Sequence, residues 1–300
     1  MKPLAALLLV PFAAAQQPLA DAALSAEIRQ ASARLGAGVF LFAKNIDTGA
    51  WFGSREDEKV STASTIKLPI LATLFDKAAK GQLRWDETLE LTAVSRVGGS
   101  GVLTEFSDGM RFPIRDLANL MIVVSDNTAT NLILDRVSAE SVNSYMDSLG
   151  LIQTRSLRKV LSGDPPKPSG WSKAGLFEAN QRFGIGVSTP REMASLMELI
   201  ANGKVVSPAA SQQMIAILDR QHYKDGIGRR LGEFKVASKS GSLSGLRSDV
   251  ALITTPKGRI AMAITVEGLK NSPFNADNPG LLLIADLARK LTNALVKTAP

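Results

Sequence analysis

The chain contains the stretch Ser61-Thr62-Ala63-Ser64-Thr65-Ile66-Lys67-Leu68-Pro69-Ile70, which is its strongest indication of both fold and chemistry. The apolar residues that follow predict a helix over 65–80, so Ser64 and Lys67 lie on one face within a single turn. A serine hydroxyl is a poor nucleophile until a neighbouring group takes its proton, and a lysine can do this when burial or a second cation lowers its pKa. Taken alone, the pair could equally be surface residues of an amphipathic helix.

Two further polar segments follow predicted elements elsewhere in the chain. The first, Ser125-Asp126-Asn127, comes after an apolar run and precedes a helical stretch, where it could be ordinary N-cap chemistry. The second, Lys239-Ser240-Gly241, comes after a short strand-like piece over 234–238, where it could be a turn. Because the three segments lie on three different elements, a single domain could bring them around one cleft.

The order Ser-x-x-Lys, Ser-Asp-Asn, Lys-Ser-Gly resembles that of class A β-lactamases and penicillin-binding proteins, which carry threonine where this chain has Ser240. The resemblance to these penicillin-recognising serine hydrolases runs from about Leu35 to the C-terminal helix. Two supporting stretches look specifically like class A: Ser125-Asp126-Asn127-Thr128-Ala129-Thr130-Asn131 and Thr189-Pro190-Arg191-Glu192-Met193-Ala194.

The predicted fold is an α/β (α+β) β-lactamase/transpeptidase-like fold, in which strands from both ends of the chain form one antiparallel sheet. The expected strands are 39–46, 50–53, 248–255 and 260–266, with flanking helices at 19–35 and 281–296. The expected helices of an inserted helical lobe are 65–80, 114–125, 128–136, 139–149, 191–202 and 208–221. We therefore expect one catalytic domain over 16–300, with an α/β lobe (18–62 and 222–300), a helical lobe (63–221) and a cleft at their junction.

The chemistry predicted for this cleft is acyl transfer. Ser64 attacks a lactam or peptide carbonyl, Lys67 is the nearest base, and Ser125 passes a proton to the leaving nitrogen. Asn127 can offer its amide to Lys67 and to the substrate.

The resemblance implies the groups that bind the substrate. Lys239 lowers the pKa of Lys67 and, with Ser240, holds the substrate carboxylate, while the backbone N–H groups of Ser64 and Ser242 form the oxyanion hole. Gly241 lets the substrate approach the strand closely. Arg247 is either a second cation for that carboxylate or an exposed strand residue.

The sequence departs from class A at two places. The family holds its hydrolytic water with a Glu on an Ω-shaped loop, which corresponds here to 162–170, but counting back from Pro190 lands on Lys173. Either Glu178 takes over this role or no such acid exists. The segment 98–103 also lacks the aromatic residue that often flanks the entrance of class A enzymes.

Composition limits the alternatives. The 300 residues contain no cysteine and one histidine, His222, so neither thiol catalysis nor a thiolate metal site is possible, and no metal or organic cofactor is implied. A net charge of +7 without a basic, aromatic-rich run argues against nucleic-acid binding. Residues 1–15 read as a signal peptide, which predicts export to the periplasm or the exterior without stable membrane insertion, and we expect a monomer.

The predicted function is that of a serine acyl hydrolase of class A β-lactamase type, which opens the β-lactam amide through a Ser64 acyl-enzyme. Two alternatives share the fold. One is a D-alanyl-D-alanine carboxypeptidase or transpeptidase that acts on peptidoglycan stem peptides, and the other is a penicilloyl-accepting sensor that does not turn over. The missing loop Glu separates the three, because its absence favours fast acylation with slow hydrolysis.

Overall fold

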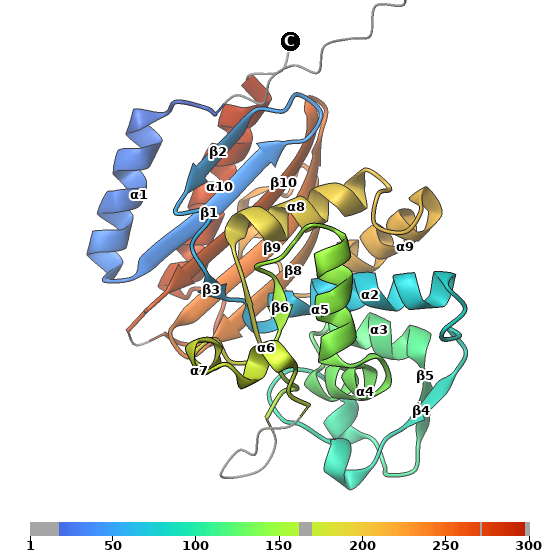
Figure 1. Cartoon of the computed structure of the whole chain (residues 1–300). Coiled ribbons are helices and arrows are strands. Elements are labelled where there is room, and N and C mark those ends of the chain that lie inside the picture. Colours follow the sequence, from blue (N-terminus) through green and yellow to red (C-terminus); the bar gives the residue numbers. More distant parts are fainter. Residues whose placement is uncertain (1–17, 162–169, 271, 298–300) are drawn as a thin grey trace, which may run out of the picture.

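The computed structural model describes residues 18–161, 170–270 and 272–297, and its centre is a five-stranded antiparallel sheet (Figure 1). In spatial order the strands are β2 (Trp51–Ser54), β1 (Gly38–Asn45), β10 (Gly258–Glu267), β9 (Leu246–Thr255) and β8 (Lys235–Leu243). The inner strands are almost continuously buried because helices cover both faces of the sheet, so both alternating sets of side chains are enclosed. The sheet is built from both ends of the chain, as the sequence predicts.

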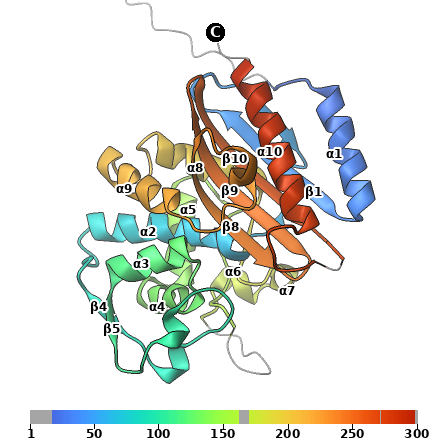
Figure 2. The same cartoon turned by 180° about the vertical axis from the view of Figure 1, so that it is seen from behind.

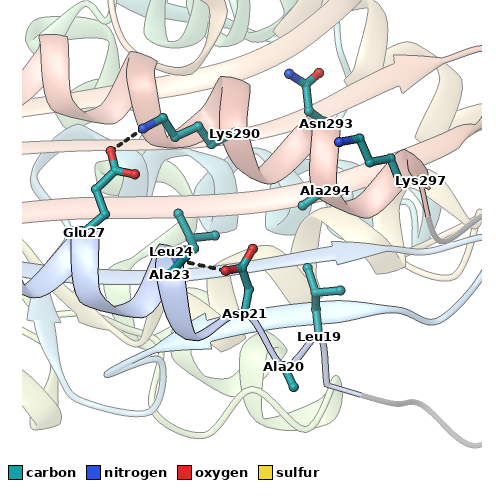
Figure 3. A pocket seen from close by; sticks show the side chains of 10 residues that line it. All are labelled: Leu19, Ala20, Asp21, Ala23, Leu24, Glu27, Lys290, Asn293, Ala294 and Lys297. Atoms are coloured by element: carbon teal, nitrogen blue, oxygen red, sulfur yellow. Dashed lines mark hydrogen bonds and ion pairs between the residues drawn. The ribbon is translucent and has the colours of Figure 1, made fainter.

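Two helices from opposite ends of the chain cover one face of the sheet (Figure 2). They are α1 (Ala22–Leu35) and α10 (Pro279–Lys297). Asp21 caps α1 by accepting a hydrogen bond from the N–H of Leu24, and Gly36 ends the helix in the left-handed conformation. A groove of about 550 Å³ lies between the two helices, with Leu24 on its floor and Lys290 paired with Glu27 across it (Figure 3).

The other face carries the helical part of the molecule. Its helices are α2 (Lys67–Ala79), α3 (Ile114–Val123), α4 (Asn127–Val137), α5 (Ala139–Ser148), α8 (Pro190–Ala201) and α9 (Pro208–Asp219). Helix α8 lies on β1, β9 and β10, and α2 is buried without interruption from Lys67 to Phe75. Its first two turns are therefore surrounded by protein, so the functional groups at the start of α2 are held rigidly.

The structure adds short elements that the sequence did not indicate. They are the strands β3 (Val60–Ser61), β4 (Thr88–Glu90), β5 (Arg111–Pro113), β6 (Arg155–Ser156) and β7 (Gly186–Ser188), the helices α6 (Lys173–Leu176) and α7 (Glu178–Gln181), and the 3₁₀ turns η1 (Ala63–Ile66), η2 (Ala93–Ser95), η3 (Leu103–Glu105) and η4 (Ile227–Arg230). Segments of two to four residues are too short to show a hydrophobic period, so only tertiary pairing defines them.

Strand β8 differs from its prediction in a way that affects the site. The strand continues through Lys239-Ser240-Gly241 to Leu243, where the sequence suggested a turn.

In the part of the chain that is described, no helix is long and apolar enough to cross a bilayer. The signal peptide and positions 162–169 of the expected Ω-shaped loop lie outside the described residues, and the division into lobes at 62/63 and 221/222 stays a prediction.

Candidate active site

Ser64 lies in η1, at the point where the chain passes from β3 into α2. The preceding segment is anchored by two bonds, from the Ser61 hydroxyl to the Phe183 carbonyl (2.8 Å) and from the Thr62 N–H to the Gly186 carbonyl (3.0 Å). Ala63 has a φ of 46°. This backbone conformation is unfavourable in free energy for residues other than glycine, and such strained residues concentrate at functional sites. Ser64 is half-buried whereas both its neighbours are buried, so this turn presents its side chain toward solvent.

Lys67 is fully buried one turn after Ser64. Its Nζ donates to the Ser125 carbonyl (2.7 Å), the Asn127 Oδ1 (2.9 Å) and the Ser125 hydroxyl (3.1 Å), and not to the Ser64 hydroxyl. Burial lowers the pKa of Lys67 well below its usual value, the charge of Lys239 lowers it further, and Asp126 opposes the shift. A lowered pKa favours the neutral amine, which is the form that can accept a proton.

The turn between α3 and α4 holds the second motif. Ser125 adopts a φ of 55°, and the next residue, Asp126, caps α4 by accepting from the N–H of Ala129 (2.8 Å). The other oxygen of Asp126 accepts from the N–H groups of Val102 (2.7 Å) and Leu103 (2.9 Å). The capping interpretation of this motif is therefore confirmed for Asp126, while its two neighbours are left to face Lys67.

Asn127 is fixed from both of its ends. Its Nδ2 donates to the Gly98 carbonyl (3.0 Å), and its backbone N–H donates to the Ser100 carbonyl (3.0 Å). A Cβ at Gly101 would lie 2.2 Å from Asp126, so only glycine allows the segment 98–101 to wrap this closely around the turn.

The third motif enters from β8. Lys239 is fully buried, and its Nζ donates to the Ser125 hydroxyl (3.1 Å) and to the Ser240 carbonyl (2.7 Å). Burial lowers the pKa of Lys239 to about 7, although the negative charge of Asp249 opposes this shift. The Ser125 hydroxyl therefore lies between two buried lysine amines, which brings all three sequence motifs together.

Gly241 brings the edge of β8 against Ser64. A Cβ at this position would lie 2.8 Å from the Thr62 carbonyl and 2.9 Å from the Ser64 backbone nitrogen. Ser242, the next residue, is exposed. The expectation that Gly241 permits a close backbone approach agrees with this geometry, although here the approaching segment is the one that carries Ser64.

Two predicted residues are not brought into the cluster. The Arg247 guanidinium is buried and donates to the carbonyls of Leu243, Leu246, Ser272 and Pro273 at 2.6–3.3 Å. Glu178 is exposed at the start of α7 and makes no hydrogen bond or ion pair with another described residue. Arg247 is therefore not an exposed cation, and Glu178 is not a carboxylate held near Ser64.

Asp249 is a buried acid that was not predicted as a site residue. Its position directly before the apolar run 250–253 was a signal in the sequence that it could be buried. It pairs with Ser240 across β8 and β9, and its Oδ2 accepts from the N–H of Ile227 (2.9 Å). Its Oδ1 is buried with no hydrogen-bond partner among the described residues. Burial raises the pKa of Asp249 to about 7, against the opposing effects of the Ile227 bond and the Lys239 charge.

This raised pKa predicts a pH dependence of stability. Between about pH 4 and 7 the folded protein keeps a proton on Asp249 that the unfolded chain has lost, so stability falls as pH rises. Asp249→Asn should remove this decline. The free energy of unfolding of both proteins is measured by urea titration between pH 5 and 7. The difference, variant minus wild type, should increase with pH by up to about 1.4 kcal/mol per pH unit. A constant difference across that range would contradict the assignment.

The fold and the three converging motifs are those of the β-lactamase/transpeptidase-like serine hydrolases. A sequence profile of the Beta-lactamase enzyme family matches residues 23–295, and the chain belongs to this family. A β-lactamase of Rhodobacter capsulatus is 25% identical over 262 residues, which cover 86% of this chain and 85% of the relative.

Two solved structures share the architecture and confirm the predicted fold class. The crystal structure of a β-lactamase from Sphaerobacter thermophilus has a TM-score of 0.77 and 28% identity, and the match covers 92% of this chain and 98% of that one. A point mutant of PBP-A, solved as an acyl-enzyme complex with penicillin G, has a TM-score of 0.79 and 26% identity, and the match covers 94% and 98%.

Proposed function

We propose that the protein is a serine acyl hydrolase of the class A β-lactamase type, which opens the β-lactam amide through an acyl-enzyme on Ser64. One observation carries the proposal: the Ser125 hydroxyl is hydrogen-bonded to both Lys67 Nζ and Lys239 Nζ, and Lys67 lies one turn after the half-buried Ser64. This arrangement supplies a nucleophile, a base of lowered pKa and a hydroxyl relay. Export through the predicted signal peptide is part of the same proposal.

The first half of the reaction forms the ester. Lys67 Nζ takes the Ser64 hydroxyl proton as the oxygen attacks the lactam carbonyl carbon. The carbon–nitrogen bond then breaks, and the Ser125 hydroxyl donates its proton to the leaving nitrogen. The lysine amines on either side of Ser125 can restore that proton. In the second half, a water molecule attacks the ester and releases Ser64.

The oxyanion is assigned to the backbone N–H groups of Ser64 and Ser242. Strand β8 lies at the edge of the sheet, and alternate N–H groups along a strand face the same side. The Ser240 N–H points away from β9, because it lies 2.7 Å from the Gln221 side chain, so the Ser242 N–H points to the same open edge. Lys239 and Ser240 would hold the substrate carboxylate, and Asn127 the substrate amide.

Arg247 has a structural role in this proposal, because its bonds to carbonyls of β8, β9 and the 272–273 segment use the N–H groups that a substrate carboxylate would need.

A second candidate is a D-alanyl-D-alanine carboxypeptidase or transpeptidase, or a sensor that stays acylated. One observation favours it: neither Asp126 nor Glu178 offers a free carboxylate that could hold a water at Ser64. Asp126, whose charge reaches Lys67, is bound to backbone N–H groups, and Glu178 is exposed. Such a site would acylate quickly and hydrolyse slowly.

The deciding experiment is mass spectrometry of the purified protein with a chromogenic cephalosporin and, separately, with a D-Ala-D-Ala peptide. Colour turnover with a transient adduct on Ser64 supports the β-lactamase. A lasting adduct without turnover removes that activity, and release of D-alanine then identifies the peptidase. Failure of both ligands to modify Ser64 would refute the acyl-enzyme proposal.

Glu178→Gln tests the acid on α7 directly. If Glu178 positioned the hydrolytic water, the variant would trap the acyl-enzyme. Because this side chain is exposed and contacts no group of the site, we expect the rate of adduct loss to stay within about twofold of wild type, the usual range for a surface substitution. A time course of adduct mass measures it, and a clearly longer-lived adduct in the variant would restore Glu178 to the mechanism.

A further inference from the structure

Gln221 is a buried polar residue that follows the last turn of α9, and only 1% of its surface is exposed. Its carboxamide lies between the end of α3 and the edge of β8. In the orientation that satisfies both ends of the amide, the nitrogen donates to the carbonyls of Ile122 (3.0 Å) and Val123 (3.3 Å), and the oxygen accepts from the Ser240 N–H (2.7 Å). Nothing in the catalytic steps above uses this side chain.

The two segments that Gln221 joins each carry one partner of the same hydrogen bond. Val123 precedes Ser125 by two residues, and Ser240 directly follows Lys239. The bond from Lys239 Nζ to the Ser125 hydroxyl (3.1 Å) spans the gap between these segments. A second contact, from the His222 N–H to the Val123 carbonyl (2.9 Å), holds the end of α9 to the same place.

We propose that Gln221 is a positioning residue that sets the separation between the Ser125 turn and β8, and thereby the contact of the Ser125 hydroxyl with Lys239. The inference rests on the proposed acylation of Ser64, because that reaction is where the contact matters. The chemistry requires an amide: the α3 end offers only carbonyl acceptors, and β8 offers an N–H donor. A carboxylate could accept from Ser240 but could not donate to the carbonyls, and an apolar side chain could do neither.

Gln221 also leaves the rest of the β8 edge open. It occupies the outward N–H of Ser240, whereas the outward N–H of Ser242 lies two residues further along the strand. An unpaired edge is otherwise a template for pairing with another chain. The side chain therefore fixes the strand from one end of the site while the oxyanion position remains accessible.

The test compares Gln221→Met and Gln221→Glu with wild type, using the second-order rate of Ser64 acylation by a chromogenic cephalosporin. We expect each variant to acylate about tenfold more slowly, the factor that corresponds to losing a buried hydrogen-bond pair. The control is Asn45→Asp, which alters an equally buried amide at the β1–β2 turn that binds the backbone of Asp47, Thr48, Lys257 and Leu295. It should lower the melting temperature and leave the acylation rate within about twofold.

A double-mutant cycle separates positioning from general loss of structure. If Gln221 acts through the Ser125 contact, Gln221→Met should change the residual acylation rate of a Ser125→Ala protein by less than about twofold. The same tenfold loss in both backgrounds would overturn the proposal. So would a Gln221→Met protein that acylates at the wild-type rate while its melting temperature falls as in the Asn45 control.

Hydrogen exchange of the Ser240 amide gives a readout that does not depend on acylation. We expect this amide to exchange faster in Gln221→Met than in wild type, because its acceptor is lost, and to be unchanged in Asn45→Asp. If wild type is never acylated, the proposed function fails, and faster exchange of Ser240 would still support the positioning role. Unchanged exchange would overturn it whatever the outcome of the acylation experiment.

Discussion

The Ser64→Ala protein is expected to form no covalent adduct with a β-lactam, in contrast to complete modification of the wild type. The acyl group has to be carried by an oxygen that is both accessible and next to a base. Ser125 is buried between Lys67 and Lys239, whereas Ser64 is half-buried on the turn that leads into α2. Removing one oxygen atom from Ser64 removes the nucleophile and leaves the lysine network in place, so the whole reaction should be lost.

Intact-protein mass spectrometry measures this result, and peptide mapping locates any remaining label. The matched control is Ser25→Ala on α1, whose hydroxyl bonds to the Asp21 carbonyl on the opposite face of the sheet. It should acylate as wild type does. An adduct of normal mass and rate in Ser64→Ala would show that another residue is acylated, and the proposed mechanism would then be wrong.

The three motifs could be predicted as one site because each combines a local signal with a chemical one. Ser64 and Lys67 are three residues apart in a helical pattern, so their proximity is fixed by local geometry. That Lys67 and Lys239 meet at Ser125 depends on tertiary structure, and the sequence indicated it only through the resemblance to a known family. The same holds for Gln221, because nothing in the sequence around an isolated glutamine shows which backbone groups it will meet.

The roles of Glu178 and Arg247 could not be decided from the sequence, for a physical reason. An arginine on a strand can face solvent, substrate or backbone carbonyls. Here the guanidinium donates to carbonyls of the segment 272–273, which is distant in sequence, so the sequence alone did not show its orientation. Glu178 begins a helix of four residues, where an acid is favourable near the positive end of the helix dipole. Its presence there has a local explanation that requires no catalytic role.

Lys67→Ala should slow acylation by roughly a hundredfold to ten-thousandfold, the range that a positioned general base contributes. The wild-type lysine is buried, and its lowered pKa favours the neutral amine, the form that can act as a base. The alanine variant removes this base and also takes the donor from the Ser125 carbonyl and from Asn127. The control is Lys44→Met, which alters another buried lysine, paired with Glu198 beneath α8, and should lower stability without changing the acylation rate.

Lys67→Arg separates the base from the charge. An arginine keeps the positive charge beside Ser125 but cannot release its proton in the accessible pH range, so it should acylate as slowly as the alanine variant. The wild-type rate should fall on the acid side, because protonation of Lys67 removes the base. In both variants the contribution of Lys67 to this acid limb should disappear, since no titrating amine remains at position 67. Stopped-flow measurement of acylation from pH 5 to 9 gives the rates and the profile together. A Lys67→Arg protein that acylates at the wild-type rate would show that the side chain acts through its charge, and the proton of Ser64 would then have to leave by another route.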